Sequence, residues 1–467
     1  MRIGKRGFAA RIKGDLRVEF GAERLTSHAG LELFRRYLGE RGLSAHLRES
    51  ERRLARRGDL RFVPLVLLVV AMLLVGGRRL RHVDFLGDDP LVRRITGLRR
   101  VPTRRTLARR LAALRKVDLD EIDRLILVTA ADSIGTHGIG RVTIDLDGSV
   151  LTTGLTVKGA VRGYNPHHRK NPSYYPITAT VAQTGHVLGH RNRPGNVHDS
   201  YRAGDFLKVT VTRLRETLAS PALVEVRADS AFVQRDFLES CDRLGVEYAL
   251  KVPMWHYLNL RGLVRSVDQS LWQTVSRAAQ VEGIFLRLEV PFWNRGEHIA
   301  IYRTRRSHQP SKGTQLDLFN PDDGYWEYSV VATNKDLGLL ALWHFMNGHG
   351  VHEKTLAELK SGFAYDQIPT RDWQANTAWQ KLNLLAHNIN VGFQVDVLQR
   401  PRARTAKRTA SFSVSSIRTV RFEWLNRAAR LSRRVARGSS DSPPTPPSKT
   451  LSRGPRPPSI RPRRMSL

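Results

Sequence analysis

The chain has 467 residues, of which 77 are Lys or Arg and 43 are Asp or Glu, so its formal net charge is +34. With 41 % hydrophobic residues it is too apolar for a wholly disordered protein, and its length allows two to four domains. The single cysteine, Cys241, excludes a disulfide framework and a cysteine-based zinc finger. So large a positive charge predicts a polyanionic partner, either nucleic acid or an acidic membrane surface.

The positive charge is concentrated at the two ends of the chain. Residues 1–120 and residues 400–467 each carry a net charge of +16, whereas residues 121–399 carry only +2. A uniformly basic coat protein would not show this distribution. It favours a near-neutral enzyme core between two ends that bind nucleic acid.

Residues 1–120 are predicted to form a basic, helical DNA-binding region. The first residues show no secretory signal, and the apolar stretch 62–75 is shorter than a bilayer requires. This stretch therefore predicts a buried helix, with a membrane anchor as the alternative. Thr103 is a candidate N-cap for a helix from Arg104 to Leu111, which either contacts DNA or is a solvated basic helix.

The middle of the chain predicts an α/β fold. Across 121–252, where a helix closes near Leu127, apolar alternation predicts strands at 142–147, 174–181, 187–190, 223–229 and 246–252, with helices at 201–217 and 236–244. Residues 253–335 predict a β-rich insertion with strands at 281–287, 298–303 and 326–333. Residues 336–400 return to helices at 337–346, 351–359 and 373–391. A basic helix is expected in 401–440, and the proline-rich residues 441–467 predict a disordered tail.

Acidic residues at the ends of predicted strands are the candidates for chemistry. Asp145 and Asp147 lie on one face of the same strand, and Asp229 ends another. Carboxylates from two strands of one sheet can converge on a divalent metal, and a third from a helix, Glu353 or Glu358, would complete a site for phosphoryl transfer. The alternative is that these aspartates are ordinary turn formers or helix caps, because an Asp-x-Asp pair alone is a weak signal.

Several motifs resemble the DDE transposases of bacterial insertion sequences, in the Tn-five-like group with a Tyr-Arg-Glu-Lys signature, and most closely its insertion-sequence 1380 branch. Residues 144–149, Ile-Asp-Leu-Asp-Gly-Ser, are similar to the first acidic motif of that family, and 227–232, Arg-Ala-Asp-Ser-Ala-Phe, to the second. Further similar segments are 163–166, 173–176, 193–196 and 331–334. The resemblance extends from about residue 25 to about residue 437.

This resemblance implies an RNase H-like catalytic core with a β-strand insertion before the last acidic residue. It implies that Asp147, rather than Asp145, together with Asp229 and Glu353 holds two Mg²⁺ ions, with Mn²⁺ as a substitute. The implied reaction is hydrolysis of DNA at the ends of the element, followed by attack of the freed 3′ hydroxyl on target DNA. Double-stranded DNA is the implied partner, bound by a homodimer in the bacterial cytoplasm beside the nucleoid, without a membrane.

The third motif of the family departs from its pattern in this chain. Aligning Glu353 with the family's Glu places Lys360 on its Lys, but Met346 stands at the Tyr position and His349 at the Arg position. In the family these two positions hold phosphates of the element end, and neither Met nor His replaces an Arg fork well. One interpretation is that another cation such as Lys354 takes this part. The alternative is a catalytically impaired or repurposed transposase that binds specific DNA.

A basic loop is the further candidate for DNA contact. Basic residues mixed with aromatics suit a splayed or hairpinned strand end. The alternative is a β-hairpin whose tyrosines pack in the core, and two histidines in this loop are interpreted as phosphate contacts rather than metal ligands. The resemblance places Arg193 and Lys360 nearer the chemistry. The predicted DNA-binding residues are Lys158, Arg162, Tyr164, Arg169, Lys170, Arg193, His349 and Lys360.

Overall fold

The computed structural model describes residues 25–55, 58, 60–87, 89–154, 156–163, 170–220, 222–253, 258–290, 295–305, 326–403 and 409–432. The chain divides into two units, Met1–Leu431 and Ser432–Leu467, and the elements below belong to the first. The predicted tail, 441–467, lies outside the described residues.

The N-terminal part of the described chain is helical, as its apolar spacing predicts. Its helices are α2 (Leu31–Glu40), α3 (Leu43–Leu54), α4 (Phe62–Leu74), the 3₁₀ helix η1 (Leu80–Leu86), α5 (Pro90–Thr96) and α6 (Arg104–Ala112). Side-chain caps start two of them: Asp89 accepts from the amides of Leu91 and Val92, and Thr103 accepts from that of Thr106, as predicted.

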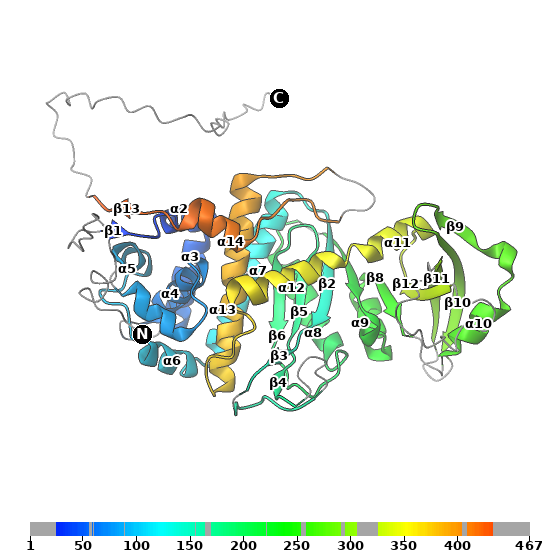
Figure 1. Cartoon of the computed structure of the whole chain (residues 1–467), viewed down its shortest axis with the longest axis horizontal. Helices are drawn as coiled ribbons and strands as arrows, with labels where there is room; N and C mark the ends of the chain where they lie inside the picture. The colour runs from blue at the N-terminus through cyan, green and yellow to red at the C-terminus, as the bar shows by residue number, and fades with distance from the viewer. Residues whose placement is uncertain are drawn as a thin grey trace, which may run out of the picture. The chain divides into compact units, whose positions relative to one another are not determined.

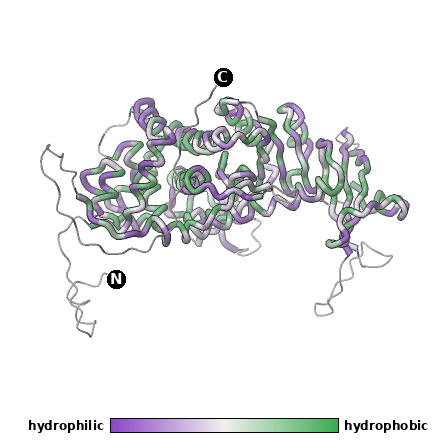
Figure 2. Tube along the Cα trace, turned by 90° about the horizontal axis from the view of Figure 1, so that it is seen from above, coloured by the Kyte–Doolittle hydropathy of each residue, from purple (hydrophilic) through white to green (hydrophobic). Residues whose placement is uncertain are grey.

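The apolar stretch that allowed a membrane anchor is a buried helix. Nearly all of α4 is inaccessible to solvent, because α3, α5 and α13 (Trp373–Gly392) pack around it. Among the described residues, no helix is long and apolar enough to cross a membrane. Both hydrophobic and hydrophilic residues occur along the whole described trace (Figure 2).

Helix α7 (Lys116–Thr136) is longer than predicted and crosses the expected domain boundary at residue 120. Its first half, with Ile122, Leu125 and Ile126, belongs to the core of the N-terminal helices, whereas Leu127 and Ile134 belong to the core beneath the sheet. Both halves of the helix are therefore stabilised by burial, and the helix continues from one core into the other. Figure 1 shows α7 and α13 between the N-terminal helices and the strands.

A nine-stranded mixed sheet forms the rest, in the order β6-β5-β2-β7-β8-β12-β11-β10-β9. Strands β2, β7 and β8 are parallel neighbours, and all the other pairs are antiparallel. The strands are β2 (Arg141–Gly148), β5 (Ile177–Val181), β6 (Val187–Arg191), β7 (Leu223–Ala228), β8 (Glu247–Val252), β9 (Gln273–Ser276), β10 (Val281–Val290), β11 (Arg295–Arg305) and β12 (Trp326–Thr333). Short β3 (Leu151–Thr152) pairs with β4 (Ser173–Tyr174).

One sequence expectation about strands needs correction in detail. The strand expected over 174–181 is divided into β4 and β5, because Pro176 between them has no amide hydrogen for a ladder. The strands of the expected insertion, 253–335, continue the main sheet, since β12 pairs with β8.

The two faces of the central strands have different chemistry. On one face, Ile144, Leu146, Val224 and Val226 pack in an apolar core with α7, α8 (Ala203–Thr217) and α9 (Arg235–Leu244). The alternate residues of the same strands are polar and face the side where α12 (Gly350–Phe363) contacts β2. The strand period of two thus places Asp145, Asp147 and Asp229 on one face.

The remaining helices are α10 (Leu260–Ser266), α11 (Leu339–Asn347) and α14 (Ile417–Val420), with short 3₁₀ turns η2 (Ser230–Phe232) and η4 (Gln269–Leu271) and π-helical segments η6 (Phe393–Leu398) and η7 (Arg421–Leu425). The basic helix expected over 401–440 is wrong within the described residues. Helical structure there ends at Leu425, and β13 (Ala429–Arg430) pairs with β1 (Leu25–Thr26). Arg421 donates to the carbonyls of Leu73, Leu74 and Gly362, so this segment closes the end of α4.

Buried histidines predict loss of stability in mild acid. Burial lowers the pKa of His186 to about 3 and that of His387 to about 4. In the unfolded chain both protonate near pH ~6.5, so the free energy of unfolding should fall as pH drops from there towards 4, by about 1.4 kcal/mol per pH unit for each histidine. Urea unfolding at pH 7.5 and pH 5 measures this. His387→Gln, which can keep the hydrogen bond to the Gly185 carbonyl, should show a shallower dependence, and an identical dependence would contradict the assignment.

Candidate functional site

Asp147 and Asp229 stand at the same level at the ends of two neighbouring parallel strands. Strands β2 and β7 pair with Leu146 opposite Ala228, so the next residue along each strand is one of the two aspartates. Asp229 leaves β7 directly and precedes the 3₁₀ turn η2. The chain thus brings together two carboxylates that are 82 positions apart in the sequence, as their strand-end positions predicted.

Asp145 has a structural partner. Its two carboxylate oxygens accept from Arg227 at 2.7 and 2.9 Å, and both side chains are fully buried. His349 adds a contact from its Nδ1 at 3.2 Å. Although burial opposes ionisation, Arg227 and His349 together hold the pKa of Asp145 below its ordinary value. The carboxylate of Asp145 is therefore paired with a buried arginine, whereas Asp147 has no such cationic partner among the described residues.

The surroundings of Asp147 disfavour its negative charge. Burial, followed by the neighbouring carboxylates Asp199 and Asp229, raises the pKa of Asp147 to about 7, although His349 opposes this. Asp199 is held by the hydroxyl of Tyr175, which donates to it at 2.7 Å. Asp199 lies so close to Gly148 that a Cβ atom on residue 148 would be 2.0 Å from Oδ1 of Asp199. A cation would relieve the repulsion among these carboxylates.

Two stacked histidines connect α12 to both aspartates of β2. The rings of His349 and His352 lie 5.7 Å apart and nearly parallel, with 12° between them. His352 is completely buried, its Nδ1 is 2.6 Å from the Thr180 hydroxyl, and its Nε2 has no hydrogen-bond partner within the described residues. That Nε2 lies 4.0 Å from Oδ2 of Asp147. Burial lowers the pKa of His352 to about 4, so the ring is neutral at neutral pH.

Glu353 lies in the first turn of α12 and lines a cavity of about 250 Å³. Lys251 lines the same cavity, and its ammonium is 2.9 Å from Oδ1 of Asp229. Lys251 thus links the carboxylate of Asp229 to the cavity that Glu353 borders. In the part of the chain that the structure describes, no three His, Cys, Asp or Glu side chains lie close enough together to hold a metal ion.

Carboxylates at the ends of β2 and β7 are nevertheless the donor type that Mg²⁺ prefers. The crowding of Asp147 by other carboxylates fits the same cation. Asp147 and Asp229 therefore suit a divalent ion in kind and position, whereas Glu353 shares its cavity with Lys251, whose ammonium already pairs with Asp229. The third ligand is not assembled with the other two.

Glu358, the alternative third carboxylate, has another function in this chain. Its Oε1 accepts from the backbone amide of Ile417 at the start of α14. Its charge also favours the protonated form of Arg421, whose pKa burial lowers to about 10. Glu358 therefore fastens the C-terminal segment to α12 and faces away from the cavity that Glu353 lines.

Lys360 and Arg193, both predicted to bind DNA, have different surroundings. Lys360 lies two helical turns after Glu353 on α12; burial lowers its pKa, and Asp147 and Asp366 partly offset this effect. Arg193 is 2 % exposed and donates to the backbone carbonyls of Tyr175, Asp199 and Tyr201. Arg193 therefore shapes the loop that carries Asp199, and a DNA contact by it stays a prediction.

His349 was expected to contact phosphate, but its ring is buried against Asp145. Of the basic loop, Lys158, Arg162 and Lys170 are exposed, whereas Tyr164 and Arg169 lie outside the described residues. Tyr174 is buried, donates to the Lys158 carbonyl and meets Trp373 edge-on. This tyrosine packs in the core, which was the alternative interpretation of the loop.

Three site residues were missed by sequence reasoning: Asp199, Lys251 and His352. Asp199 follows the Arg193 loop, and nothing in the local sequence indicates that this loop folds back beside Gly148. Lys251 looks like any alternating strand lysine. His352 adjoins Glu353, and its i,i+3 spacing from His349 was the one signal that a helix would stack both rings.

Most of the chain is similar to known proteins. Residues 8–438 match a family model described as Transposase DDE domain group 1. Among solved structures, the chain is similar to the piggyBac transposase in a synaptic complex with hairpin DNA, at 12 % sequence identity and a TM-score of 0.41, covering 86 % of this chain and 82 % of that chain. No curated protein matches the chain.

Matched substitutions at Asp145 and Asp147 should separate the structural aspartate from the candidate functional one. Asp145→Asn leaves Arg227 buried beside a neutral group, and losing one partner of a buried pair costs about 3–5 kcal/mol of unfolding free energy. Asp147→Asn removes one of several crowded carboxylates and should leave stability unchanged or raised. Urea unfolding in metal-free buffer at pH 8 measures both. Equal losses for the two variants would show that this distinction is wrong.

Proposed function

Because the chain belongs to the transposase DDE domain family, we propose that it is the enzyme of a DNA-transposition reaction. In this proposal it hydrolyses a phosphodiester at each end of a mobile element and joins the freed 3′ hydroxyl to target DNA. We place it in the Tn-five-like group, in the insertion-sequence 1380 branch, on its acidic motifs. We also propose that its core is RNase H-like. The order β6-β5-β2-β7-β8, antiparallel and then parallel, supports this assignment.

The observation that carries the proposal is that Asp147 and Asp229 lie side by side at the ends of the neighbouring parallel strands β2 and β7. These are the two positions that the sequence motifs single out. Asp145, the competing residue of the first motif, is already bound by Arg227. The proposed third catalytic residue is Glu353, because Glu358 is bound to the Ile417 amide.

The proposed cofactor is Mg²⁺, with two ions per site and Mn²⁺ as a substitute. Asp147 and Asp229 would hold it, with Glu353 as the further ligand. When bound, such ions lower the pKa of an attacking water or hydroxyl and stabilise the leaving oxygen. The chain's own residues contribute position and charge: Lys251 neutralises Asp229 before the substrate arrives, and Lys360 supplies a cation near Asp147 for a phosphate.

His352 is proposed as a positioning residue for Asp147. In the tautomer in which the Thr180 hydroxyl donates to Nδ1, the ring proton is on Nε2 and faces Oδ2 of Asp147 across 4.0 Å. That separation is too long for a hydrogen bond, and a small movement of either side chain would make one. Because the ring is fully buried and stacked on His349, it presents one fixed donor to the carboxylate.

A second candidate function is a repurposed or impaired transposase that binds specific DNA without cutting it. The observation that favours it is the burial of His349, which stands at the family's Arg position yet bonds to Asp145. Met346, at the Tyr position, is also buried. Neither side chain is presented to a phosphate in this conformation, so Lys360, Lys251 or Lys354 would have to take that part.

The partners follow from the proposed reaction. They are double-stranded DNA at the element ends and at the target, and a second copy of the chain, so that paired ends are held by a homodimer. The proposed location is the bacterial cytoplasm, at the nucleoid. The basic regions 1–120 and 401–440 and the loop residues Lys158, Arg162, Tyr164, Arg169 and Lys170 are proposed as DNA contacts. We propose that the catalytic core is formed by residues 121–252 and 336–400, and that residues 253–335 are an insertion between its two parts. The proposed tail is 441–467.

Substitution of the three acidic residues tests the proposal. Asp147→Ala, Asp229→Ala and Glu353→Ala should each lower nicking of a plasmid that carries the element ends by more than about 100-fold in Mg²⁺, since each removes a proposed metal ligand. Duplex binding should persist in all three. Mn²⁺ binding followed by electron paramagnetic resonance gives a readout independent of turnover. Glu358→Ala, with its intramolecular role, is the matched control and should still nick.

The outcomes separate the two candidate functions. Nicking by the unaltered protein that Asp147→Ala removes excludes the non-cleaving alternative. End binding without nicking, in Mg²⁺ and in Mn²⁺, supports it. Full nicking by Asp229→Ala would falsify the assignment of the catalytic aspartates.

A pair of substitutions at His352 tests its positioning role. His352→Leu keeps the buried volume but loses the donor, so it should weaken Mn²⁺ binding by about 10–100-fold while duplex affinity stays the same. His352→Gln retains an amide donor and should recover part of the loss. A leucine variant with normal Mn²⁺ affinity would reduce His352 to a packing residue.

A further inference from the structure

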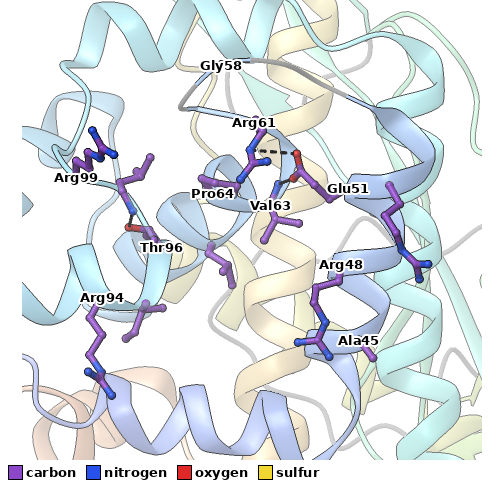
Figure 3. Close-up of a pocket in the computed structure, with 15 residues that line it drawn as sticks. Ala45, Arg48, Glu51, Gly58, Arg61, Val63, Pro64, Arg94, Thr96 and Arg99 are labelled. Atoms are coloured by element: carbon purple, nitrogen blue, oxygen red, sulfur yellow. Dashed lines mark hydrogen bonds and ion pairs between the residues drawn. The ribbon is translucent and has the colours of Figure 1, made fainter.

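A large cavity lies among the N-terminal helices, away from the aspartates. Its volume is about 1230 Å³, and it is bordered by α3, by the segment that leads into α4, and by the end of α5 with the turn after it. Figure 3 shows Arg94 and Arg99 on one side of this space, Arg48 and Glu51 on the other, and Arg61 between them. We call it the arginine cavity.

The charge of the arginine cavity is strongly positive. Among the described residues, five arginines line it, Arg48, Arg52, Arg61, Arg94 and Arg99, against a single carboxylate, Glu51. Glu51 is already occupied, because it accepts from the Val63 amide at 2.7 Å and pairs with Arg61 at 3.6 Å. The other four arginines are exposed and form no hydrogen bond or ion pair within the described residues.

The positions of these arginines are fixed by rigid elements. Arg48 and Arg52 are four residues apart on α3, so they project from the same face of that helix. Arg94 is in the last turn of α5, where Gly97 with a φ of 69° turns the chain towards Arg99. Like charges held around one concave surface focus its potential and attract an anion with several charges.

The lining also distinguishes among anions. Between the arginines are aliphatic side chains, including Pro64, Leu67 and Leu98, and the lining within the described residues contains no aromatic ring. Sites for single-stranded DNA stack bases on aromatic rings, so this surface does not suit unpaired bases. Its volume exceeds that of most small-molecule sites, and its cations face one another across the space, which suits a polymer of phosphates.

We propose that the arginine cavity binds the phosphate backbone of duplex DNA. This inference rests on the proposed function and specifies where the N-terminal region holds its substrate. Each free guanidinium presents a planar fork of donors that pairs with two phosphate oxygens. Binding displaces counterions, so each phosphate contact adds to the salt dependence of affinity. The basic helix α6, the contact expected from sequence, is then secondary.

Two charge-matched triple variants of the full chain test the proposal. The cavity variant is Arg48→Gln/Arg94→Gln/Arg99→Gln, and the control is Arg104→Gln/Arg105→Gln/Arg109→Gln. These three control side chains on α6 are also exposed and without a partner among the described residues. Affinity for a short blunt-ended duplex is measured over a range of salt concentrations. The cavity variant should lower the slope of log affinity against log salt by about 3, near 0.9 for each contact, and the control by less than about 1.

The outcomes are distinct. Equal slopes for the two variants, or an unchanged cavity variant, overturn the proposal, because bulk charge then explains binding. If the cavity variant keeps its affinity for the duplex but loses affinity for polyglutamate, the proposal is overturned in favour of an acidic protein partner. Arg94→Lys, which keeps the charge but not the fork, should keep the slope and lose affinity. If the unaltered protein binds no duplex, the proposed function fails as well; if it binds and nicks while the cavity variant is unaffected, only this inference fails.

Discussion

The buried pair between Asp145 and Arg227 is the contact on which the site depends. Both side chains are inaccessible to solvent, and their two hydrogen bonds join β2 to β7 one level before the strands end. A buried arginine without its carboxylate is costly, so this pair opposes any slip of one strand against the other. A slip of one residue would turn the aspartate of the shifted strand, Asp147 or Asp229, to the face opposite the other one. The same pair orients His349, and through ring stacking His352.

The charge distribution of the site follows from this arrangement. Arg227 pairs with Asp145 and so does not neutralise Asp147. The charged neighbours that raise the pKa of Asp147 are instead the carboxylates of Asp199 and Asp229. Lys251 neutralises only Asp229. The site is therefore acidic inside a very basic chain. Such separation suits a reaction in which a polyanion must approach a cluster of carboxylates, because the surrounding basic surface offsets the repulsion.

The sequence was informative where periodicity or spacing was strong. Period-two alternation located the central strands, and two strand-end aspartates predicted a shared edge, which the register of β2 and β7 confirms. Local patterns could not show that α7 continues across two cores, because each half has an apolar face of its own. They also could not show that Arg193 is buried or that Lys251 reaches Asp229. Those features depend on where loops and neighbouring strands meet in space, and a single sequence does not encode such contacts locally.

The short pairing of β1 with β13 has a consequence for how the protein is made. Leu25 and Thr26 align with Arg430 and Ala429, and Arg421 completes the end of α4. About 400 residues separate β1 from β13, which at typical synthesis rates corresponds to roughly 20–80 s. During that interval the N-terminal bundle lacks its last strand and the cation that binds the α4 carbonyls. A strand that is synthesised early is thus among the last elements to be completed, and a chain still on the ribosome carries its arginine cavity on an incomplete helical bundle.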